Sequence, residues 1–584
     1  MDIAHGTVGT KVHVPPGLVD FGRETEHLSR EHDWELARNA QARKAAGVFY
    51  TPGVIVDGLV SLTLEEVALL QAGLPTVLDP CCGTGNFLDA VYRRLLASIP
   101  DATQVGPRIG LLTASIFGCD SDARAVEIAK RRLWQTAIET SNEWVPFAEF
   151  PHQNFLVGDA LSLVPTDDAR HLVLGAAWGP WLTAAFRRRF GIVIGNPPYG
   201  KVRLPGAQRR YFADSVYGHA NTYALFLHLG VELLEDGGAL GYVLPASMLS
   251  GLYFKNLRKF LIEHCSIRAI VQFGQRTGLF EAVLQEIMFL VVRREIAQGR
   301  YQLRVGAIER KEEMADARLF GQALRRVSSD QVLRRPDGYP LIHVPPRDGA
   351  AGIYEKYEVV GLPLMHPSIG YVAKTGPIVW NRLKGHLCDQ PIPDSLPLVW
   401  SNNVSGFAFD ATGNRGGKCG YLRLDERTRH LLTRGPCVLV QRTTAKEQRR
   451  RLVAAFPLEW EARVGPFFVE NHLNAIVPIK GARSVLPECI MALLNSRLLD
   501  FVFRASNGNT QVSATELNMM RFVAGSASDQ IAAAARDIQS ALLAGQPQRA
   551  ARSVDELDHL VYDLYGLSTG EIRIVESCTQ GLRL

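Results

Sequence analysis

The stretch Gly195-Asn196-Pro197-Pro198-Tyr199 places groups that could hold a planar amine within five residues. It follows the β-branched run Ile192-Val193-Ile194, which predicts a buried strand, so the polar residues are expected where a strand opens into a loop. Proline fixes its own φ angle and has no N–H, so this loop should present its carbonyl groups as rigid hydrogen-bond acceptors.

These acceptors match an exocyclic –NH2 group. Its two N–H bonds could donate to the Asn196 side chain and the Pro197 carbonyl, while the Tyr199 ring stacks on the attached aromatic ring. The nitrogen lone pair would then be free to attack, so this arrangement would make an aromatic amine more nucleophilic. The plain alternative is an Asn-Pro-Pro turn that only ends a strand.

A second chemical motif is the glycine-rich turn at residues 79–88, Asp-Pro-Cys-Cys-Gly-Thr-Gly-Asn-Phe-Leu. It follows a predicted strand at 76–78 and precedes a predicted helix, and Gly83 and Gly85 allow a tight turn with close backbone approach. This pattern predicts a nucleotide-type cradle. A third glycine at dinucleotide spacing and a Gly-Lys-Ser/Thr phosphate loop are both missing, which disfavours NAD and ATP.

Acidic residues recur where further predicted strands end. Asp79 and Asp120 close strands at 76–78 and 116–119, and Asp159 follows a strand at 155–157. With Asn196, they predict one crevice at the carboxyl ends of four parallel strands.

Three more strands are predicted at residues 240–244, 267–273 and 286–292, with a helix at 222–234 before them. The expected fold is α/β, a seven-stranded Rossmann-like sheet in which the last two strands form an antiparallel edge, followed by a smaller α+β domain.

The first residues of the chain show little periodicity, so residues 1–32 are predicted to form an arm. The pattern at 33–46 predicts a helix. The next segment, residues 47–52, reads Gly-Val-Phe-Tyr-Thr-Pro, where Thr51 is expected to cap a helix that begins near Pro52. Such a helix start can hold a small anion.

Composition bounds the class of protein. The 584 residues are 47% hydrophobic and 21% charged, as in a soluble globular protein of two to four domains. No apolar run could span a bilayer and no signal peptide is apparent, so a cytoplasmic location and no membrane partner are expected. The nine scattered cysteines predict neither a disulfide framework nor a metal site.

The carboxy-terminal half holds the basic surplus. Residues 370–528 carry 20 Lys and Arg against 12 Asp and Glu, whereas the whole chain has a net charge of +5. This distribution favours a polyanionic partner, although a solvated basic surface would look the same. We predict a catalytic domain at 33–330, a linker at 331–365, a recognition domain at 366–528 and a helical tail at 529–584.

Together, the motifs at 47–52, 79–88 and 196–199, in this order, resemble the amino-methyltransferases among the S-adenosylmethionine-dependent DNA methyltransferases. The likeness is to the gamma-ordered adenine-N6 enzymes of Type II restriction-modification systems, with a TaqI-like carboxy-terminal recognition region. Weaker likenesses lie at 441–444, 470–474 and 492–496. The chain departs from the pattern at Cys81-Cys82, where small residues usually stand, and at Asp122, which lacks a following proline.

The resemblance implies S-adenosylmethionine as cofactor. Thr51 would bind the cofactor carboxylate, Asp120 its ribose and Asp159 its adenine amine. The turn from Asp79 to Gly85 would bind the methionine part, through residues that include Asp79, Cys81, Gly83 and Gly85.

The resemblance also implies direct methyl transfer to an adenine that is flipped out of duplex DNA, without a metal. Tyr199 would stack on this base, and Phe280 is a candidate for its opposite face, with a core phenylalanine as the equal alternative. Basic residues after the catalytic tetrad could grip phosphates or form a solvated loop: Lys201, Arg203, Arg209 and Arg210. The basic tract at 446–451 is expected to contact phosphate if it touches DNA.

Alternatives remain at this point. The same tetrad could present an RNA base, a protein glutamine or the N4 amine of cytosine, and a catalytically silent DNA-binding specificity protein is a different class. Cys81 or Cys82 could act as a thiol nucleophile, although packing is the preferred interpretation. No nuclease-like constellation is apparent, so a cognate restriction endonuclease is expected to be a separate partner.

Overall fold

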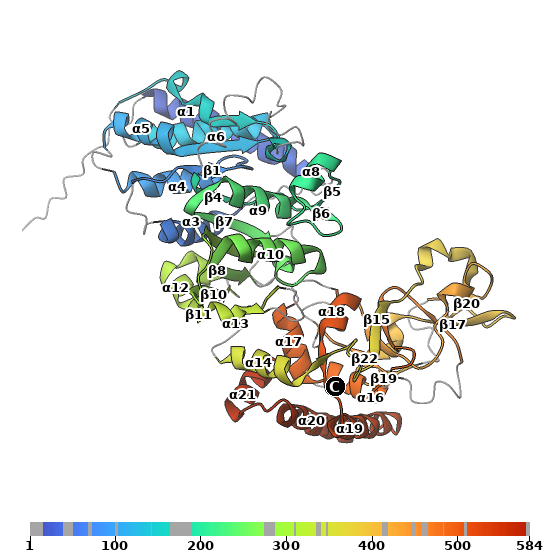
Figure 1. Ribbon diagram of the computed structural model, residues 1–584. Helices are drawn as coiled ribbons and strands as arrows, with labels where there is room; N and C mark the ends of the chain where they lie inside the picture. The colour runs from blue at the N-terminus through green and yellow to red at the C-terminus, as the bar shows by residue number, and fades with distance from the viewer. Residues whose placement is uncertain are drawn as a thin grey trace, which may run out of the picture. The chain divides into compact units, whose positions relative to one another are not determined.

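The computed structural model divides the chain into two compact units (Figure 1). Unit 1 comprises residues 1–248 and 253–329, and unit 2 comprises residues 249–252 and 330–584. The residues that the structure describes are 16–38, 51–67, 73–99, 103–139, 141, 143–163, 190–273, 287–308, 311–334, 340–345, 349–410, 418–444, 448, 450–456, 465–482, 484–506 and 511–579.

Unit 1 contains a nine-stranded mixed sheet of order β11-β10-β8-β9-β7-β4-β1-β2-β3. Strands β7, β4, β1, β2 and β3 are parallel, while β9 lies between β7 and β8 and is antiparallel to both. The strands are β1 (Val77–Asp79), β2 (Ile116–Asp120), β3 (Phe155–Val157), β4 (Phe190–Gly195), β7 (Leu234–Pro245), β8 (Cys265–Phe273), β9 (Ile287–Arg294), β10 (Gln302–Ile308) and β11 (Leu324–Ser328).

The α/β class and all seven predicted strands are confirmed, but the sheet is larger than predicted. β10 pairs with β8 in parallel and β11 pairs with β10 antiparallel, so β8 and β9 are not the edge. The two added strands are joined through the short helices α11 (Lys311–Ala315) and α12 (Ala317–Ala323). The first four residues of β10, Gln-Leu-Arg-Val, alternate between polar and apolar, which is a period-two signal of a strand in the sequence itself.

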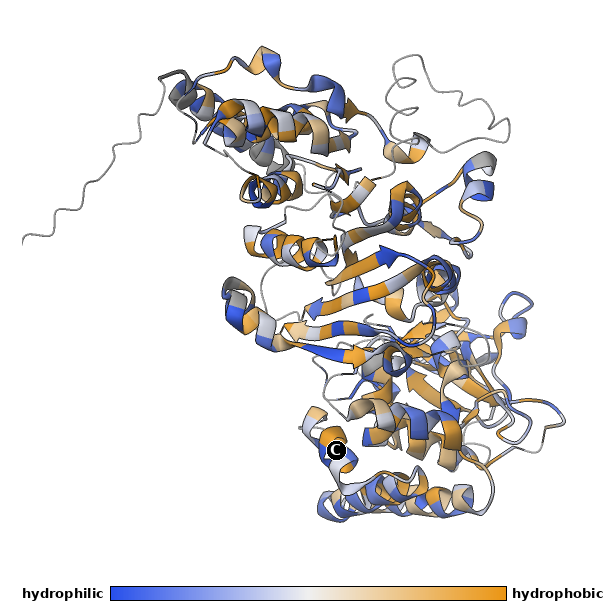
Figure 2. Cartoon of the chain, turned by 60° about the vertical axis from the view of Figure 1, so that its left-hand side comes forward, coloured by the Kyte–Doolittle hydropathy of each residue, from blue (hydrophilic) through white to orange (hydrophobic). Residues whose placement is uncertain are grey.

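Helices cover both faces of this sheet. On β7, an added Cβ at Gly241 would lie 2.1 Å from Thr63 of α3 (Gly53–Val67). The side chains of Leu240 and Tyr242, on either side of Gly241, approach Gly230 of α9 (Thr222–Leu233). Successive strand residues point to opposite faces, so α3 and α9 lie on opposite sides. Figure 2 shows hydrophobic residues, in orange, along the strands between them.

The amino-terminal region holds a helix where an arm was predicted. Helix α1 (Pro16–Arg38) packs on α6 (Ala123–Ile138), and its Phe21 ring centroid lies 5.4 Å from that of Phe147, in the segment after α6. Two ion pairs join the helices, Glu24 to Arg131 at 3.2 Å and Glu31 to Arg124 at 2.7 Å. Much of the α1 contact is therefore ionic, which explains why hydrophobic periodicity did not reveal it.

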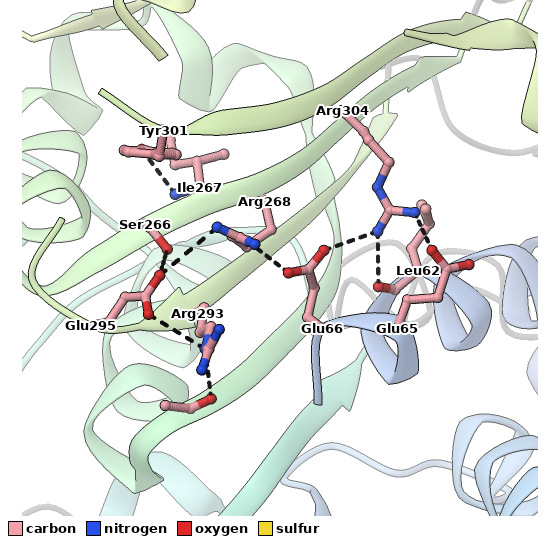
Figure 3. A network of polar contacts seen from close by, with 11 residues as sticks. Leu62, Glu65, Glu66, Ser266, Ile267, Arg268, Arg293, Glu295, Tyr301 and Arg304 are labelled. Carbon is pink, nitrogen blue, oxygen red and sulfur yellow. Dashed lines mark hydrogen bonds and ion pairs between the residues drawn. The ribbon is translucent and has the colours of Figure 1, made fainter. Parts of the chain in front are cut away.

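A network of ion pairs fixes α3 to strands β8 and β10 of the sheet (Figure 3). The Glu66 carboxylate accepts from Arg268 Nε of β8 at 2.6 Å and from Arg304 Nη2 of β10 at 3.0 Å. Arg304 also pairs with Glu65, while Arg268 and Arg293 both approach Glu295. The Glu66 side chain is only 9% exposed, so these bonds anchor the helix that directly follows Thr51 and Pro52.

We therefore expect Glu66→Gln to lower the free energy of unfolding by about 2 kcal/mol, because charge-assisted hydrogen bonds to two arginines are lost. Glu65→Gln is the matched control on the same helix. The Glu65 side chain is 61% exposed, so the loss there should stay below about 1 kcal/mol. Denaturant unfolding of both variants measures the difference, and equal losses would contradict the anchoring role of Glu66.

Unit 2 combines two four-stranded sheets with a helical layer and has its own hydrophobic core. One sheet contains β15 (Tyr371–Thr375), β24 (Leu473–Pro478), β21 (Val438–Gln441) and β22 (Ala454–Ala455), and the other contains β16 (Leu387–Cys388), β20 (Tyr421–Arg423), β17 (Ser395–Val399) and β23 (Phe468–Val469). Its main helices are α14 (Ala350–Val360), α16 (Pro487–Leu494), α17 (Arg497–Ser506), α18 (Ala514–Met519), α19 (Ser526–Leu543), α20 (Pro547–Leu564) and α21 (Thr569–Cys578).

Unit 2 contains the segments predicted as a linker, a helical tail and a basic tract. The linker segment contains α14, whose Ile353 and Tyr354 are buried in the core, so its described part is not a bare connection. Within the predicted helical tail, α20 buries Leu557 and Val561 on one face. The phosphate contact predicted at 446–451 is wrong for Arg451, which is 0% exposed. Two other residues of that tract are also described: Gln448, and Arg450, which is buried.

Among the described residues, no helix combines the length and apolar character needed to cross a membrane.

Candidate active site

The four polar residues predicted at strand ends lie along one edge of the sheet. Strands β4, β1, β2 and β3 are consecutive and parallel. Asp79 and Asp120 are the last residues of β1 and β2, Asn196 directly follows β4, and Asp159 lies two residues beyond β3. The structure thus places one amide and three acids at neighbouring carboxyl ends.

The Asn196 amide is held from both sides. Its Nδ2 donates to Thr51 Oγ1 at 3.0 Å, and the Tyr199 hydroxyl donates to its Oδ1 at 2.7 Å. The same hydroxyl lies 3.1 Å from the Val243 carbonyl oxygen of β7. A carbonyl oxygen has two lone pairs, so the oriented Oδ1 can still accept a hydrogen bond from a bound amine.

Tyr199 is braced in turn by its surroundings. Its ring meets the buried ring of Tyr223 edge to face, with centroids 6.0 Å apart. Burial, reinforced by Tyr223, raises the pKa of the Tyr199 hydroxyl well above its ordinary value, so the group stays protonated and acts as a donor.

Gly195, which belongs to the predicted stretch but had no role assigned to it, is required by close packing. A Cβ at this position would lie 2.6 Å from Asp79 Oδ1 and 3.0 Å from its Cγ. The signal was a glycine between a buried strand and the polar tetrad. Any larger residue would separate the ends of β4 and β1, and with them Asn196 and Asp79.

Asp79 is a carboxyl group in an almost dry position. It is 1% exposed and accepts a hydrogen bond from the Cys81 backbone N–H at 3.0 Å. Burial raises its pKa to about 8, with a further contribution from the Asp120 charge, while the hydrogen bonds from Cys81 oppose the shift. A cationic ligand at this site would favour the ionised form.

The glycine-rich turn joins β1 to α4 (Asn86–Leu96) and reaches the end of β2. Gly83, with φ at +51°, donates its N–H to Asp120 Oδ2 at 2.8 Å. Gly85, with φ at +82°, packs so closely that a Cβ would lie 2.9 Å from the Ala129 Cβ of α6. Both glycines therefore serve the tight turn that was predicted.

The thiols of this turn are poor nucleophiles. Burial raises the pKa of both Cys81 and Cys82 well above the ordinary value, and the neighbouring Asp79 and Asp120 charges add to the shift. A thiol nucleophile needs the opposite shift, so this geometry supports the packing interpretation.

Asp120 and Asp159 differ in exposure. Asp120 accepts from the backbone N–H groups of Gly83 and Asp122, and burial raises its pKa. Asp159 is exposed, and its Oδ1 accepts from the Leu161 N–H at 2.9 Å. The missing proline after Asp122 leaves the next helix intact, because the Asp122 side chain caps α6 itself.

Helix α1 reaches this end of the sheet, which the sequence did not indicate. His32 Nε2 lies 3.1 Å from Asp122 Oδ2, and the His32 side chain is 8% exposed. The loop after Asp120 is therefore braced by a residue about 90 positions earlier in the sequence.

Thr51 lies in the site but does not play the local role predicted for it. The Pro52 carbonyl accepts from the N–H groups of Ile55 and Val56, so the helix cap falls at Pro52. Thr51 is buried and uses its hydroxyl for Asn196 instead. Residues 47–50 and Phe280 lie outside the described residues.

The basic residues predicted to grip phosphates follow the tetrad and are exposed. Lys201 belongs to β5 (Lys201–Val202), which pairs with β6 (Ala220–Asn221). Arg209 and Arg210 lie in α8 (Gly206–Tyr211). The four exposed cations are Lys201, Arg203, Arg209 and Arg210.

Comparisons with known proteins agree with this geometry. The family described as "Eco57I restriction-modification methylase" matches residues 114–280. The chain is 28% identical to the Type II methyltransferase M.PstI of Providencia stuartii, over 57% of this chain and 65% of that protein, and so spans just under two thirds of that relative. It is also 28% identical to the Type II methyltransferase M.BsuBI of Bacillus subtilis, over 82% of this chain and 87% of that protein.

Among solved structures, the fold is similar to that of a nuclease-deletion mutant of the Type ISP restriction-modification enzyme LlaGI, determined with a DNA substrate mimic. The TM-score is 0.57 at 13% sequence identity, over 84% of this chain and 47% of that one. At this identity the likeness concerns the fold alone.

The fold, the strand-end site and these relatives define a methyltransferase of the restriction-modification kind, with S-adenosylmethionine as its cofactor. More particularly, they support a Type II methyltransferase of the gamma class.

Proposed function

We propose that this protein transfers a methyl group from S-adenosylmethionine to the N6 amine of an adenine flipped out of duplex DNA, at one short sequence. The observation that carries the proposal is the Asn196 amide, fixed by Thr51 and Tyr199 at the head of a proline loop beside three strand-end acids. The arrangement presents acceptors to a planar amine. As the N–C bond forms, the S–C bond of the sulfonium would break and leave a neutral thioether. The methylated amine would then carry the positive charge, which makes it acidic enough to release one proton without a strong base.

The acids suit the cofactor's chemistry, because its ammonium, ribose hydroxyls and adenine amine are all hydrogen-bond donors. S-adenosylmethionine supplies a methyl group on a positively charged sulfur. Asp79 would hold the ammonium group with the turn through Cys81, Gly83 and Gly85, while Asp120 would hold the ribose and Asp159 the adenine amine. Thr51 Oγ1 accepts one hydrogen bond and could donate another to the carboxylate.

The target amine would donate to Asn196 Oδ1 and to the Pro197 carbonyl, while the base stacks on Tyr199. Flipping the base costs about a few kcal/mol, which stacking and strand contacts would offset. The cations Lys201, Arg203, Arg209 and Arg210 would contact phosphates near the flipped nucleotide. Unit 2, whose residues 370–528 carry the basic surplus, would read the sequence.

Several relatives support this substrate. M.PstI and M.BsuBI are named as Type II methyltransferases, and a DNA complex of DrdV shares the fold with a TM-score of 0.54. The protein would protect DNA from a separate cognate restriction endonuclease.

The decisive experiment is modified-base sequencing of DNA from cells that express the protein, beside cells that express Asn196→Ala. N6-methyladenine at one short motif, present only with the intact protein, is the expected result. If N4-methylcytosine is found instead, the target base is cytosine and not adenine. If the DNA is unmodified but RNA or a protein glutamine is methylated, the substrate is not DNA. If the protein binds DNA but transfers no methyl group, it is a catalytically silent DNA-binding specificity protein.

The bond from Asn196 to Thr51 allows a further test. Thr51→Val keeps the shape of the side chain but removes the hydroxyl that accepts from Asn196 Nδ2, so we expect kcat to fall about tenfold, the equivalent of one hydrogen bond. Thr51→Ser keeps the hydroxyl and should retain most of the rate. A rise in the cofactor dissociation constant with kcat unchanged would assign Thr51 to the cofactor alone.

A further inference from the structure

Two exposed tyrosines flank a glycine turn close to the catalytic loop. Tyr217 is 39% exposed and Tyr253 is 48% exposed, although tyrosine carries a large apolar ring. Gly218 has φ at +68°, and a Cβ there would lie 3.0 Å from two ring atoms of Tyr253. The His219 ring centroid is 5.9 Å from that of Tyr253. The turn thus gathers aromatic side chains that the core does not use.

Cations accompany these rings. Lys255 Nζ lies 3.8 Å from the centroid of the Tyr217 ring, at the start of α10 (Lys255–His264). Arg209 Nη2 donates to the Gly218 carbonyl oxygen at 2.9 Å. Asn256 Nδ2 donates to the Val216 carbonyl at 3.1 Å, and this bond ties α10 to the segment that carries Tyr217.

Backbone hydrogen bonds connect this turn to the catalytic tetrad. The Thr222 N–H donates to the carbonyl of Gly200, the residue directly after Tyr199, at 2.8 Å. Strand β6, which follows the turn, pairs with β5, which follows the tetrad. The rings are therefore held on a frame that starts at the catalytic loop.

Partly exposed aromatic rings next to cations match the chemistry of an unstacked nucleotide. Bases stack on aromatic rings without regard to sequence, and ammonium and guanidinium groups attract phosphate. A flipped-out base disrupts the stack on its own strand, so nucleotides beside it lose their normal neighbours. A protein partner is a poorer match, because its docking surface would need a contiguous apolar patch rather than two rings between cations.

We propose that Tyr217, Tyr253 and Lys255 form a nucleotide-binding platform that holds the DNA strand beside the target adenine. This inference rests on the proposed function and adds residues that the tetrad and its basic loop do not include. The rings stack on a base displaced from its neighbour, and Lys255 contacts an adjoining phosphate.

The first test measures DNA affinity by fluorescence anisotropy, on a duplex that carries the motif found by sequencing. Tyr217→Ala and Tyr253→Ala should each weaken binding about tenfold, in line with the loss of one stacked base, while the corresponding phenylalanine variants bind like wild type. S-adenosylmethionine binding, measured by calorimetry, should not change and reports that unit 1 is folded.

Ile296→Ala is the control for an exposed apolar side chain. Ile296 is 78% exposed and follows β9, which runs antiparallel to β7, so it lies at the opposite edge of the sheet from the tetrad. DNA affinity should be unchanged in this variant.

The second test separates charge from packing. Lys255→Gln should reduce the slope of log affinity against log salt concentration by about 1, the value for one phosphate contact. Lys259→Gln, on the same helix, is the matched control, because Lys259 is 66% exposed and pairs with Glu263 at 3.8 Å. Its slope should match that of wild type.

The outcomes distinguish a failure of the nucleotide-binding platform from a failure of the proposed function. If wild type methylates DNA but the tyrosine and Lys255 variants match their controls, the platform is wrong and the proposed function stands. If wild type neither binds nor methylates DNA, both are overturned.

Discussion

Asn196→Ala is expected to lower the rate of methyl transfer to DNA by a factor of about 10³, because it removes the placed acceptor that holds the amine in the attacking geometry. The cofactor dissociation constant should stay within about twofold of wild type, since no cofactor contact is assigned to this side chain. Transfer of labelled methyl groups under single-turnover conditions measures the first quantity, and calorimetry the second.

Two variants sharpen this test. Asn196→Asp keeps an oxygen acceptor but loses the N–H donor to Thr51 and adds a negative charge near Asp79, so it should also be severely impaired. Asp159→Ala should weaken cofactor binding first and leave transfer at saturating cofactor largely intact. Full activity in both alanine variants would show that the active site lies elsewhere.

The parts of the site that the sequence revealed share one property. Asp79, Asp120, Asp159 and Asn196 each follow a short apolar run in the sequence, and the carboxyl ends of parallel strands meet at one edge of the sheet whatever the details of packing. The strand pattern alone therefore predicts that these four side chains lie close together. Gly83 and Gly85 predict the tight turn that follows Asp79.

What the sequence missed depends on contacts between distant segments. The burial of Arg451 is set by unit 2 packing, in which Asp500, 49 residues away, accepts its backbone N–H, and a basic tract gives no sign of such a partner. Helix α1 is held on α6 largely by charges that appear only when both helices are present. Thr51 looked like a cap because its local neighbours allow one, whereas its actual partner lies 145 residues further on.

The neighbouring positions of Tyr217 and Tyr253 also depend on a contact between distant segments. Nothing in their spacing predicts that one turn would gather both, since Tyr253 reaches Gly218 from a different segment. Hydrophobic patterning would have assigned both to the core, where most tyrosine rings of this chain are buried among the described residues.

The second large effect is expected at Asp79, whose pKa of about 8 places its titration in an accessible range. Below this pH the carboxyl group is mostly protonated, and binding a cationic ammonium group requires it to lose the proton. The affinity for S-adenosylmethionine should therefore rise close to tenfold per pH unit from about pH 6 to 7.5, with release of up to one proton per cofactor bound. Calorimetry in buffers of different ionisation enthalpy measures both quantities.

Asp79→Asn should bind the cofactor weakly and with little dependence on pH. Asp159→Asn is the matched control, because Asp159 is exposed and should leave the pH slope of affinity unchanged. A wild-type affinity that is flat across this range would contradict the assignment of the ammonium group to Asp79.

The same pKa has a consequence for stability without cofactor. The native pKa of Asp79 lies above the ordinary value of 3.8, so between these values the folded protein binds more protons than the unfolded chain. The free energy of unfolding contributed by this group should therefore fall as pH rises from about 4 to 8. Asp79→Asn removes that dependence and should be more stable than wild type at pH 7.5, which denaturant unfolding at several pH values can establish. A variant that gains stability while it loses cofactor affinity would mark Asp79 as a residue kept for binding, at the expense of the fold.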